Sequence, residues 1–222
     1  DLKPIVERAL RMKKIGNQLL AIIGGREVHP ISACVGGFYR APTKKELLAL
    51  KADLEWGLEA AIGTVALTAT LPFPDFAPDY EFVSMRHPDE YPMNEGRIVS
   101  SKGLDIEMAA FEKYFTEEHV EHSNALHAHR INGGSYHVGP LARLNQNLDR
   151  LTPLAKEAME KTGIEFPNNN PFISIVARAV ETVLAFEEAL QIVDTYRQPI
   201  PSHFPVKTKA GEGCHLTEAP RG

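Results

Sequence analysis

The stretch NPFISIVARAVETVLAFEEALQIV, residues 170–193, indicates a long helix that lies inside the protein. Its apolar side chains recur at helical spacing and cover more than half of the circumference, which is more than a surface helix needs. Asn170-Pro171 suits a helix start, and Pro199 prevents the helix from continuing. We therefore expect a central helix of about seven turns, at ~3.6 residues per turn, that ends near Tyr196. Its apolar face comprises Phe172, Ile175, Val176, Ala179, Val180, Val183, Leu184, Ala185, Leu190 and Val193.

The same pattern leads to predictions about which apolar side chains are buried and about what surrounds two carboxylates. Val180, Val183 and Leu184 should lie inside the core. Glu181 and Glu187 should face polar groups or a partner, because an unpaired buried carboxylate is costly.

Further helices are indicated on both sides of the central one. Residues 2–23 have helical apolar spacing and are followed by Gly24, which favours a helix end. The sequence TKKE is a capping box that opens a second helix over residues 43–62. Two more helices should begin at Pro140 and Pro153, since proline is well tolerated in a first helical turn.

Residues 79–139 have a different pattern, typical of short strands and turns. YEFVSM (80–85) and GRIVSS (96–101) are strand candidates, and residues 109–120 indicate one short helix. Asn132-Gly133-Gly134 predicts a hairpin turn between two short flanking runs.

The predicted fold class is therefore α+β, mainly α, a bundle of long helices with a small β-containing insertion. We expect one domain overall. Its segments are a first helical part at residues 1–78, the insertion at 79–139, and a second helical part at 140–222.

Composition excludes several function classes. The chain has 222 residues and a formal net charge of −5, which argues against a general nucleic-acid binder. No apolar run approaches the roughly 20 residues that a membrane span needs, and no signal peptide is visible. The chain begins at Asp1 inside a helical pattern and stops in a loop-like tail. We therefore expect it to be a piece of a larger protein.

Two groups of potential metal ligands need interpretation. The sequence HVEHSNALHAH carries imidazoles and one carboxylate at spacings that fit no known metal site well. We therefore favour hydrogen-bonded surface histidines over a metal centre. Cys34 and Cys214 could form a disulfide, a metal pair or two buried thiols, and inert thiols are the preferred interpretation. The potential ligands in the first group are His119, Glu121, His122, His127 and His129.

Neither nucleophilic catalysis nor phosphate binding has a signature here. The chain lacks G-x-S-x-G and G-x-x-x-x-G-K, and its first glycine pair follows a helix rather than a strand. Two short motifs near the margins remain, GGREVHP (24–30) and EAPRG (218–222). Each one alone could be an ordinary loop with structural glycines and a surface arginine.

Taken together, these motifs resemble the large, catalytic subunit of nickel-iron hydrogenases. GGREVHPISACVGGF (24–38) looks like the family's central glycine-rich motif, and EAPRG (218–222) looks like its Glu-Ala-Pro-Arg-Gly motif. Residues 87–106 and 122–147 are similar to the cytoplasmic, cofactor-reducing branch. The resemblance runs from one end of the chain to the other.

The resemblance implies roles for particular residues. Arg221 would be catalytic, above the open metal position. Glu218, Pro220 and Arg221, with Arg26 and His29, would surround the metal centre, and the Pro220–Arg221 backbone would hydrogen-bond iron-bound cyanides. The family binds nickel and iron through two C-x-x-C motifs, which this sequence lacks, so we expect no metal ligand in this chain.

The resemblance also implies partners and a location. The parent subunit would contain a nickel-iron centre with CN and CO ligands and cleave H2. It would pass electrons to an iron-sulfur small subunit, which works with electron-carrier subunits. It would be cytoplasmic, without a membrane span and without nucleic acid. The 222 residues alone should be inactive and free of cofactor. The alternatives are the quinone-site subunit of respiratory complex I, which typically has Lys where this chain has Arg221, and an inactive domain of the same fold.

Overall fold

The computed structural model describes residues 2–131 and 133–221, which form two compact units. The first unit comprises the described residues up to Thr64 together with Thr182–Gly211. The second comprises Val65–Glu181 and the described residues from Glu212 onward. Each unit is therefore built from segments that are far apart in the sequence.

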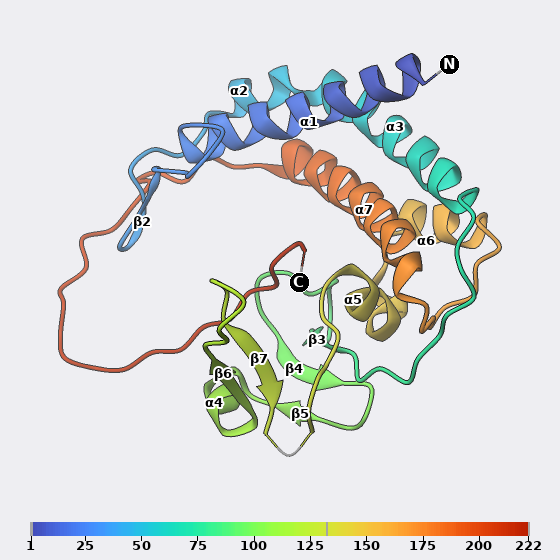
Figure 1. Ribbon diagram of the computed structural model, residues 1–222. Helices are drawn as coiled ribbons and strands as arrows, with labels where there is room; N and C mark the ends of the chain where they lie inside the picture. The colour runs from blue at the N-terminus through green and yellow to red at the C-terminus, as the bar shows by residue number, and fades with distance from the viewer. Residues whose placement is uncertain (1, 132, 222) are drawn as a thin grey trace. The chain divides into compact units, whose positions relative to one another are not determined.

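The first unit is mainly helical (Figure 1). It contains α1 (Lys3–Gly24), α2 (Lys44–Ala49), most of α3 (Lys51–Ala69) and the second part of α7 (Ser174–Thr195). Two short antiparallel strands, β1 (Ala33–Cys34) and β2 (Gly37–Phe38), lie between α1 and α2. The core residues of this unit come from all four helices and are Ile15, Leu47, Leu50, Leu54 and Val193.

The second unit contains the β structure. An antiparallel sheet has the strand order β3 (Val83–Arg86), β4 (Arg97–Ser100), β5 (Asp105–Ile106). A separate hairpin pairs β6 (Phe115–Glu118) with β7 (His127–Arg130). The core between them is formed by Val83, Ile98, Ile106 and Phe115.

Helical segments complete the second unit. The short helices are α4 (Phe111–Tyr114), α5 (Pro140–Gln146) and α6 (Pro153–Glu160), with single 3-10 turns at Met108–Ala110, Leu148–Arg150 and Pro171–Ile173. Helix α5 packs against β3, which brings its buried side chains to the edge of the sheet. The fold class predicted from the sequence, mainly α with a small β-containing part, is confirmed. The three-segment domain division stays a prediction.

Helix α7 confirms the burial predicted for the central stretch. Val180 and Val183 are fully buried and Leu184 is 3% exposed. Glu181 is paired with an arginine, as a buried carboxylate requires. The helix has 22 residues, about six turns at ~3.6 residues each, and so is one turn shorter than predicted.

Two predictions from the sequence are wrong in detail. Residues 109–120 are not one helix, because the chain leaves α4 at Tyr114 and continues directly into β6. Strand β7 pairs along its length with β6, and toward the glycines it makes only an isolated antiparallel bridge between Arg130 and Gly134. Asn132, which we placed in that turn, lies outside the described residues.

The expected second helix is divided. The capping box of Thr43 and Glu46 is present, and α2 ends at Ala49 before α3 begins at Lys51. Helix α3 then extends beyond the predicted end at residue 62.

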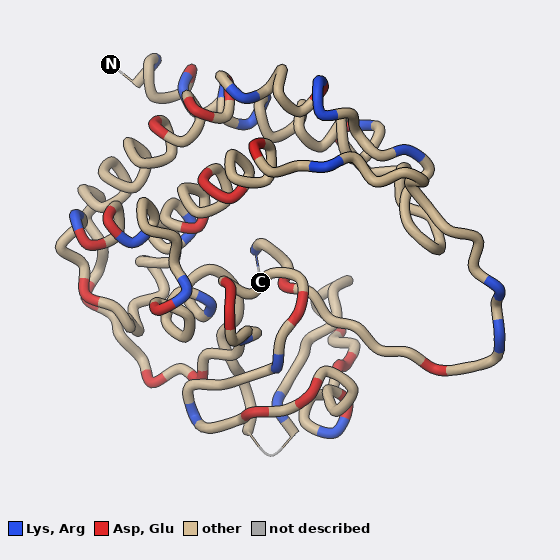
Figure 2. Tube along the Cα trace, turned by 180° about the vertical axis from the view of Figure 1, so that it is seen from behind, with Lys and Arg blue, Asp and Glu red and all other residues tan. Residues whose placement is uncertain are grey.

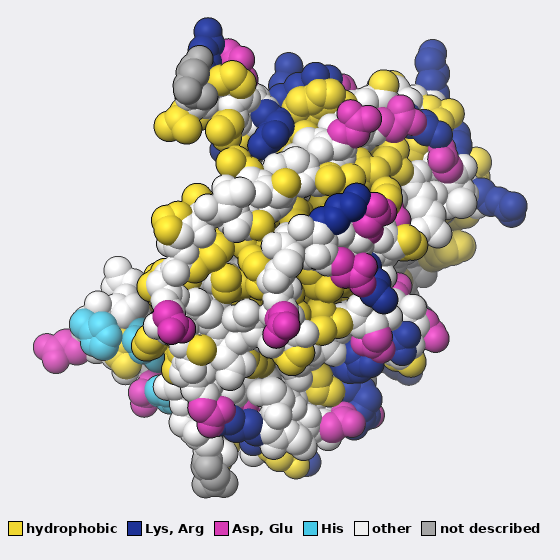
Figure 3. Space-filling view, turned by 90° about the vertical axis from the view of Figure 1, so that its right-hand side faces the viewer, with side chains coloured by type: hydrophobic (Ala, Val, Ile, Leu, Met, Phe, Trp, Pro, Cys, Tyr) yellow, Lys and Arg dark blue, Asp and Glu magenta, His cyan; other side chains and the backbone are white. Residues whose placement is uncertain are grey.

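The surface shows a mixture of charge and apolar groups. Figure 2 shows Lys and Arg interspersed with Asp and Glu along the trace rather than gathered into a basic stripe. Figure 3 shows hydrophobic side chains reaching the surface between charged ones. Among the described residues, no helix is both long enough and apolar enough to cross a membrane.

Candidate functional site

The C-terminal segment Glu218–Arg221 is held against the sheet of the second unit. The Glu218 amide donates to the Met93 carbonyl at 2.9 Å. In return, the Glu218 carboxylate accepts a 2.6 Å bond from the Met85 amide, in strand β3. The start of the segment is thus fixed by both its backbone and its side chain.

Arg143 on helix α5 fixes the rest of the segment. Its side chain is completely buried, at 0% exposure. Nη1 donates to the Glu218 carboxylate at 3.2 Å and to the Ala219 carbonyl at 2.8 Å, and Nη2 donates to the Pro220 carbonyl at 2.8 Å. On the other side, Nε and Nη2 bind the two carboxylate oxygens of Glu181 at 2.6 and 2.8 Å. All five N–H donors of the guanidinium therefore have acceptors.

The electrostatics of this network follow from its burial. Burial raises the pKa of Glu218, although the Met85 amide and the charge of Arg143 act in the opposite direction. Burial would lower the pKa of Arg143, but its bonds to Glu181 and the charge of Glu218 raise it further above its ordinary value. The guanidinium is therefore charged at every accessible pH.

Tyr91 closes the network on the side of Glu181. Its hydroxyl donates to Glu181 Oε1 at 2.7 Å. Burial and the neighbouring carboxylate raise the pKa of Tyr91 well above its ordinary value. The phenol thus remains a proton donor that satisfies the buried carboxylate.

A second set of bonds attaches α5 to β3. The Asn147 side-chain amide donates to the Met85 carbonyl at 3.1 Å and to the Arg143 carbonyl at 2.9 Å. Arg86 in β3 binds Asp149 through both Nη atoms at 2.8 Å. These bonds hold Arg143 in a fixed position relative to the strand that anchors Glu218.

Arg221, the predicted catalytic residue, follows directly after this anchored stretch and is exposed. Gly222, the last residue of the motif, lies outside the described residues. The structure thus places Glu218 and Pro220 in one hydrogen-bonded network and leaves the Arg221 side chain at the surface of the second unit.

The other predicted residues, Arg26 and His29, belong to the first unit. Both are exposed, and Arg26 Nε donates to the His29 carbonyl at 2.6 Å. His29 has a positive φ of 52°, an uncommon conformation for a residue other than glycine. The loop returns to the end of α1, where the Ile31 amide donates to the Gly24 carbonyl at 2.8 Å.

The glycine pairs around that loop have local structural causes. A Cβ at Gly24 would lie 2.8 Å from the Pro30 side chain, and one at Gly36 would lie 2.2 Å from the Phe204 carbonyl oxygen. Gly36 and Gly37 also have φ values of 94° and 145°. These glycines therefore permit close packing of the loop on its own chain.

The histidines of the β6–β7 hairpin do not gather into a metal site among the described residues. His129 bonds to Glu118 at 2.7 Å, and the rings of His122 and His127 lie edge to face at 5.4 Å between centroids. The two cysteines are free thiols, and Cys34 is half-buried and Cys214 exposed, so the expectation of two buried thiols is wrong.

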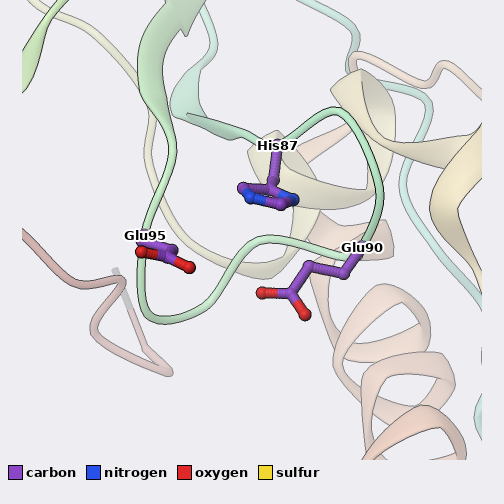
Figure 4. Close-up of side chains that lie close together, drawn as sticks. All are labelled: His87, Glu90 and Glu95. Carbon is purple, nitrogen blue, oxygen red and sulfur yellow. The ribbon is translucent and has the colours of Figure 1, made fainter.

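Among the described residues, one group of three potential metal ligands lies within 4.8 Å, and the sequence patterns did not single it out: His87, Glu90 and Glu95 (Figure 4). His87 Nδ1 already accepts the Asp89 amide at 3.2 Å. Both glutamates are exposed, and water screens the repulsion between them, so the arrangement does not require a cation.

Sequence reasoning found the motif but not the residues that hold it. No sequence motif singles out Tyr91 or Arg143. The available signal was an arginine inside the apolar run PLARL (140–144), since a charged residue between buried leucines needs a buried partner. Glu181 was predicted to need such a partner.

The sequence of this chain is similar to those of known hydrogenase subunits. No family model matches the sequence. The alpha subunit of sulfhydrogenase 1 from Pyrococcus furiosus is 32% identical over 226 residues, covering 100% of this chain and 53% of that protein. The F420-non-reducing hydrogenase subunit vhc of Methanococcus voltae is 28% identical over 249 residues, covering 98% of this chain and 51% of that protein. The chain therefore spans about half the length of these relatives.

Solved structures agree with the sequence comparison. The NAD+-reducing nickel-iron hydrogenase in the H2-reduced state matches with a TM-score of 0.73 and 18% identity, over 88% of this chain and 48% of that one. The nickel-iron-selenium hydrogenase of Dm. baculatum matches with a TM-score of 0.68 and 19% identity, over 96% and 53%. The fold is that of the nickel-iron hydrogenase large subunit. By sequence, the chain is a homologue of hydrogenase alpha subunits along its whole length.

Proposed function

We propose that this chain is part of the catalytic subunit of a nickel-iron hydrogenase, which cleaves H2 reversibly into a hydride and a proton. The observation that supports this most strongly is the 32% identity, across the whole chain, to the alpha subunit of a hydrogenase. The hydrogenase relationship also makes the two alternatives, an inactive domain or a complex I subunit, less well supported. The relatives' names differ in the electron acceptor, so the proposal concerns the hydrogen half-reaction.

Arg221 is the catalytic residue in this proposal. Its guanidinium carries a positive charge and offers a planar set of donors. It can orient a base or stabilise negative charge that develops as H2 is split. Its place directly after the anchored residues supports this role, because Arg143 holds the backbone before it in one position.

The remaining motif residues have supporting roles. Glu218 and Pro220 hold the backbone that presents Arg221, and Arg26 and His29 contribute polar groups from the first unit. The bond from Arg26 to the His29 carbonyl supports a defined loop conformation rather than a loose one.

In this proposal the ligands of the nickel-iron centre come from outside these 222 residues. Such a centre needs soft thiolate ligands, and the group of potential ligands found among the described residues, His87, Glu90 and Glu95, contains no cysteine. The centre, with its CN and CO ligands, would therefore be bound by cysteines in the rest of the subunit. The 222 residues alone would be inactive.

Partners and location follow from the same relationship. The iron-sulfur small subunit would take the electrons and pass them to carrier subunits, and the enzyme would work in the cytoplasm. Exposed apolar side chains on the first unit support a protein partner, since Val28, Ile31 and Val35 are 64%, 58% and 77% exposed.

The proposal is tested on the complete subunit, purified with its partner proteins. We expect two C-x-x-C motifs in the flanking sequence, about one nickel per subunit, and H2-dependent reduction of a viologen dye. A complete subunit without those motifs, without nickel and without dye reduction would contradict the proposal.

A further inference from the structure

One buried arginine binds the three consecutive motif residues that precede Arg221. Arg143 contacts the Glu218 carboxylate and the carbonyls of Ala219 and Pro220, with distances of 3.2, 2.8 and 2.8 Å. The residues bound are those directly before Arg221. The family resemblance implied no role for Arg143.

We propose that Arg143 is the positioning residue of this site. It fixes the peptide planes of Ala219 and Pro220 and thereby the direction in which the Arg221 side chain leaves the backbone. The effect on H2 turnover rests on the proposed function, whereas the effect on the backbone does not.

The chemistry of the segment explains why a side chain must perform this task. Pro220 has no amide hydrogen, so it cannot anchor itself by donating to a neighbouring strand. Its carbonyl and that of Ala219 both accept from Arg143, although the two residues are themselves exposed. Arg143 supplies those donors from a single rigid plane, which sets the two carbonyls relative to each other.

The bonds on the other side of the guanidinium explain why its plane is held in one orientation. Glu181 binds Nε and Nη2 in a bidentate pair, and Tyr91 in turn donates to Glu181. A lysine at position 143 would keep the charge but offer three donors and no plane. It could not bind Glu181 in this way and hold both carbonyls as well.

The matched control is Arg130, which is also a largely buried arginine in the second unit. Its side chain is 17% exposed and pairs with Glu81, which is 10% exposed. It makes no described contact with residues 218–221. Arg130→Lys therefore tests the general effect of replacing a buried, paired arginine.

The experiment compares Arg143→Lys and Arg130→Lys in the complete, assembled enzyme. Hydrogen–deuterium exchange of peptides covering residues 218–221 reports the backbone, and dye-coupled H2 oxidation reports turnover at matched nickel content. For Arg143→Lys we expect at least tenfold faster exchange in that segment. We also expect kcat to fall about 100-fold, the size expected for an ångström-scale misplacement, with an unchanged KM for the dye. Arg130→Lys should change neither the exchange nor kcat.

The outcomes separate this inference from the proposed function. If residues 218–221 of the Arg143→Lys variant exchange at the wild-type rate, the inference is overturned, whatever the turnover. Faster exchange in an enzyme whose wild type does not oxidise H2 would support the positioning role and contradict the proposed function. If Arg143→Lys does not fold, Glu181→Gln takes its place, since it loosens the guanidinium without removing it. About tenfold lower kcat and faster exchange are then expected, and wild-type values would again overturn the inference.

Discussion

At the scale of single residues, the site depends on the balance of charge around Arg143. One permanent cation faces two carboxylates, Glu181 and Glu218, with exposures of 12% and 9%. The surplus negative charge is tolerated because Tyr91 and the Met85 amide donate to those carboxylates. A buried network of this kind is stable only when every member is satisfied.

The catalytic assignment makes a direct prediction for Arg221→Lys in the complete enzyme. The substitution keeps the positive charge but loses the planar set of donors. We expect H2 turnover to fall by about two orders of magnitude, the usual effect of losing a positioned catalytic group. The measurement is dye-coupled H2 oxidation with nickel content determined in parallel. Near-normal turnover at full metal content would refute the role.

Glu218 should make stability depend on pH. Burial raises its pKa above the ordinary value of 4.5, so the folded state binds its proton more tightly than the unfolded state. Its contribution to stability is therefore fully present below pH 4.5 and is lost as pH rises through the raised pKa.

The comparison is with Glu218→Gln, which cannot ionise. We expect the melting temperature of the wild type, relative to this variant, to fall as pH rises from about 4 and then to level off above the raised pKa. Melting curves from about pH 4 to 8 measure this difference. A difference that stays constant or increases over that range would show that the pKa is not raised.

At the scale of elements, the long helices could be predicted from the sequence, and several short elements could not. Helices α1 and α7 have enough apolar periodicity to be recognised by themselves. Strand β6 was mistaken for part of a helix because residues 109–120 have helical apolar spacing, and the pairing with β7 that makes them a strand is a tertiary contact.

The same reason explains what was missed at the site. The EAPRG motif is local and could be recognised from its letters, but its anchors lie at residues 85, 93 and 143. Nothing in the sequence near Glu218 specifies which of the chain's arginines will reach it. The network follows from how α5 packs on β3, which is a property of the fold.

Helix α7 provides a prediction about stability. Leu184 is 3% exposed, so Leu184→Ala removes buried methyl groups and leaves a cavity. We expect a loss of about 2 to 5 kcal/mol in the free energy of unfolding, measured by chemical denaturation. Ile192→Ala, at a position of the same helix that is 58% exposed, is the control and should cost less than about 1 kcal/mol. Equal losses for both variants would contradict the buried position of Leu184.

At the scale of the whole molecule, the chain has a known type of fold and spans part of the proteins that share it. It aligns with hydrogenase alpha subunits along its full length and spans about half of theirs. Its two cysteines are free thiols, and neither belongs to a described group of metal ligands. The fold is therefore shown, whereas a metal centre near these residues belongs to the proposed function.

This leads to a prediction for the 222 residues expressed alone. They should bind neither nickel nor iron in stoichiometric amounts, because a soft nitrogen and sulfur site cannot form without the missing thiolates. Elemental analysis of the purified chain, before and after treatment with a chelator, checks this. Close to one nickel per chain that resists the chelator would show that the chain has a site of its own.

The most direct test of the central claim is isotope exchange by the complete enzyme under D2 in ordinary water. Heterolytic cleavage separates D2 into a deuteride and a deuteron, and the deuteron exchanges for a solvent proton before the reaction reverses. We therefore predict that HD forms, that it forms without any electron acceptor, and that Arg221→Lys slows it about 100-fold. A nickel-loaded enzyme that produces no HD would contradict the claim that this chain belongs to a subunit that cleaves H2.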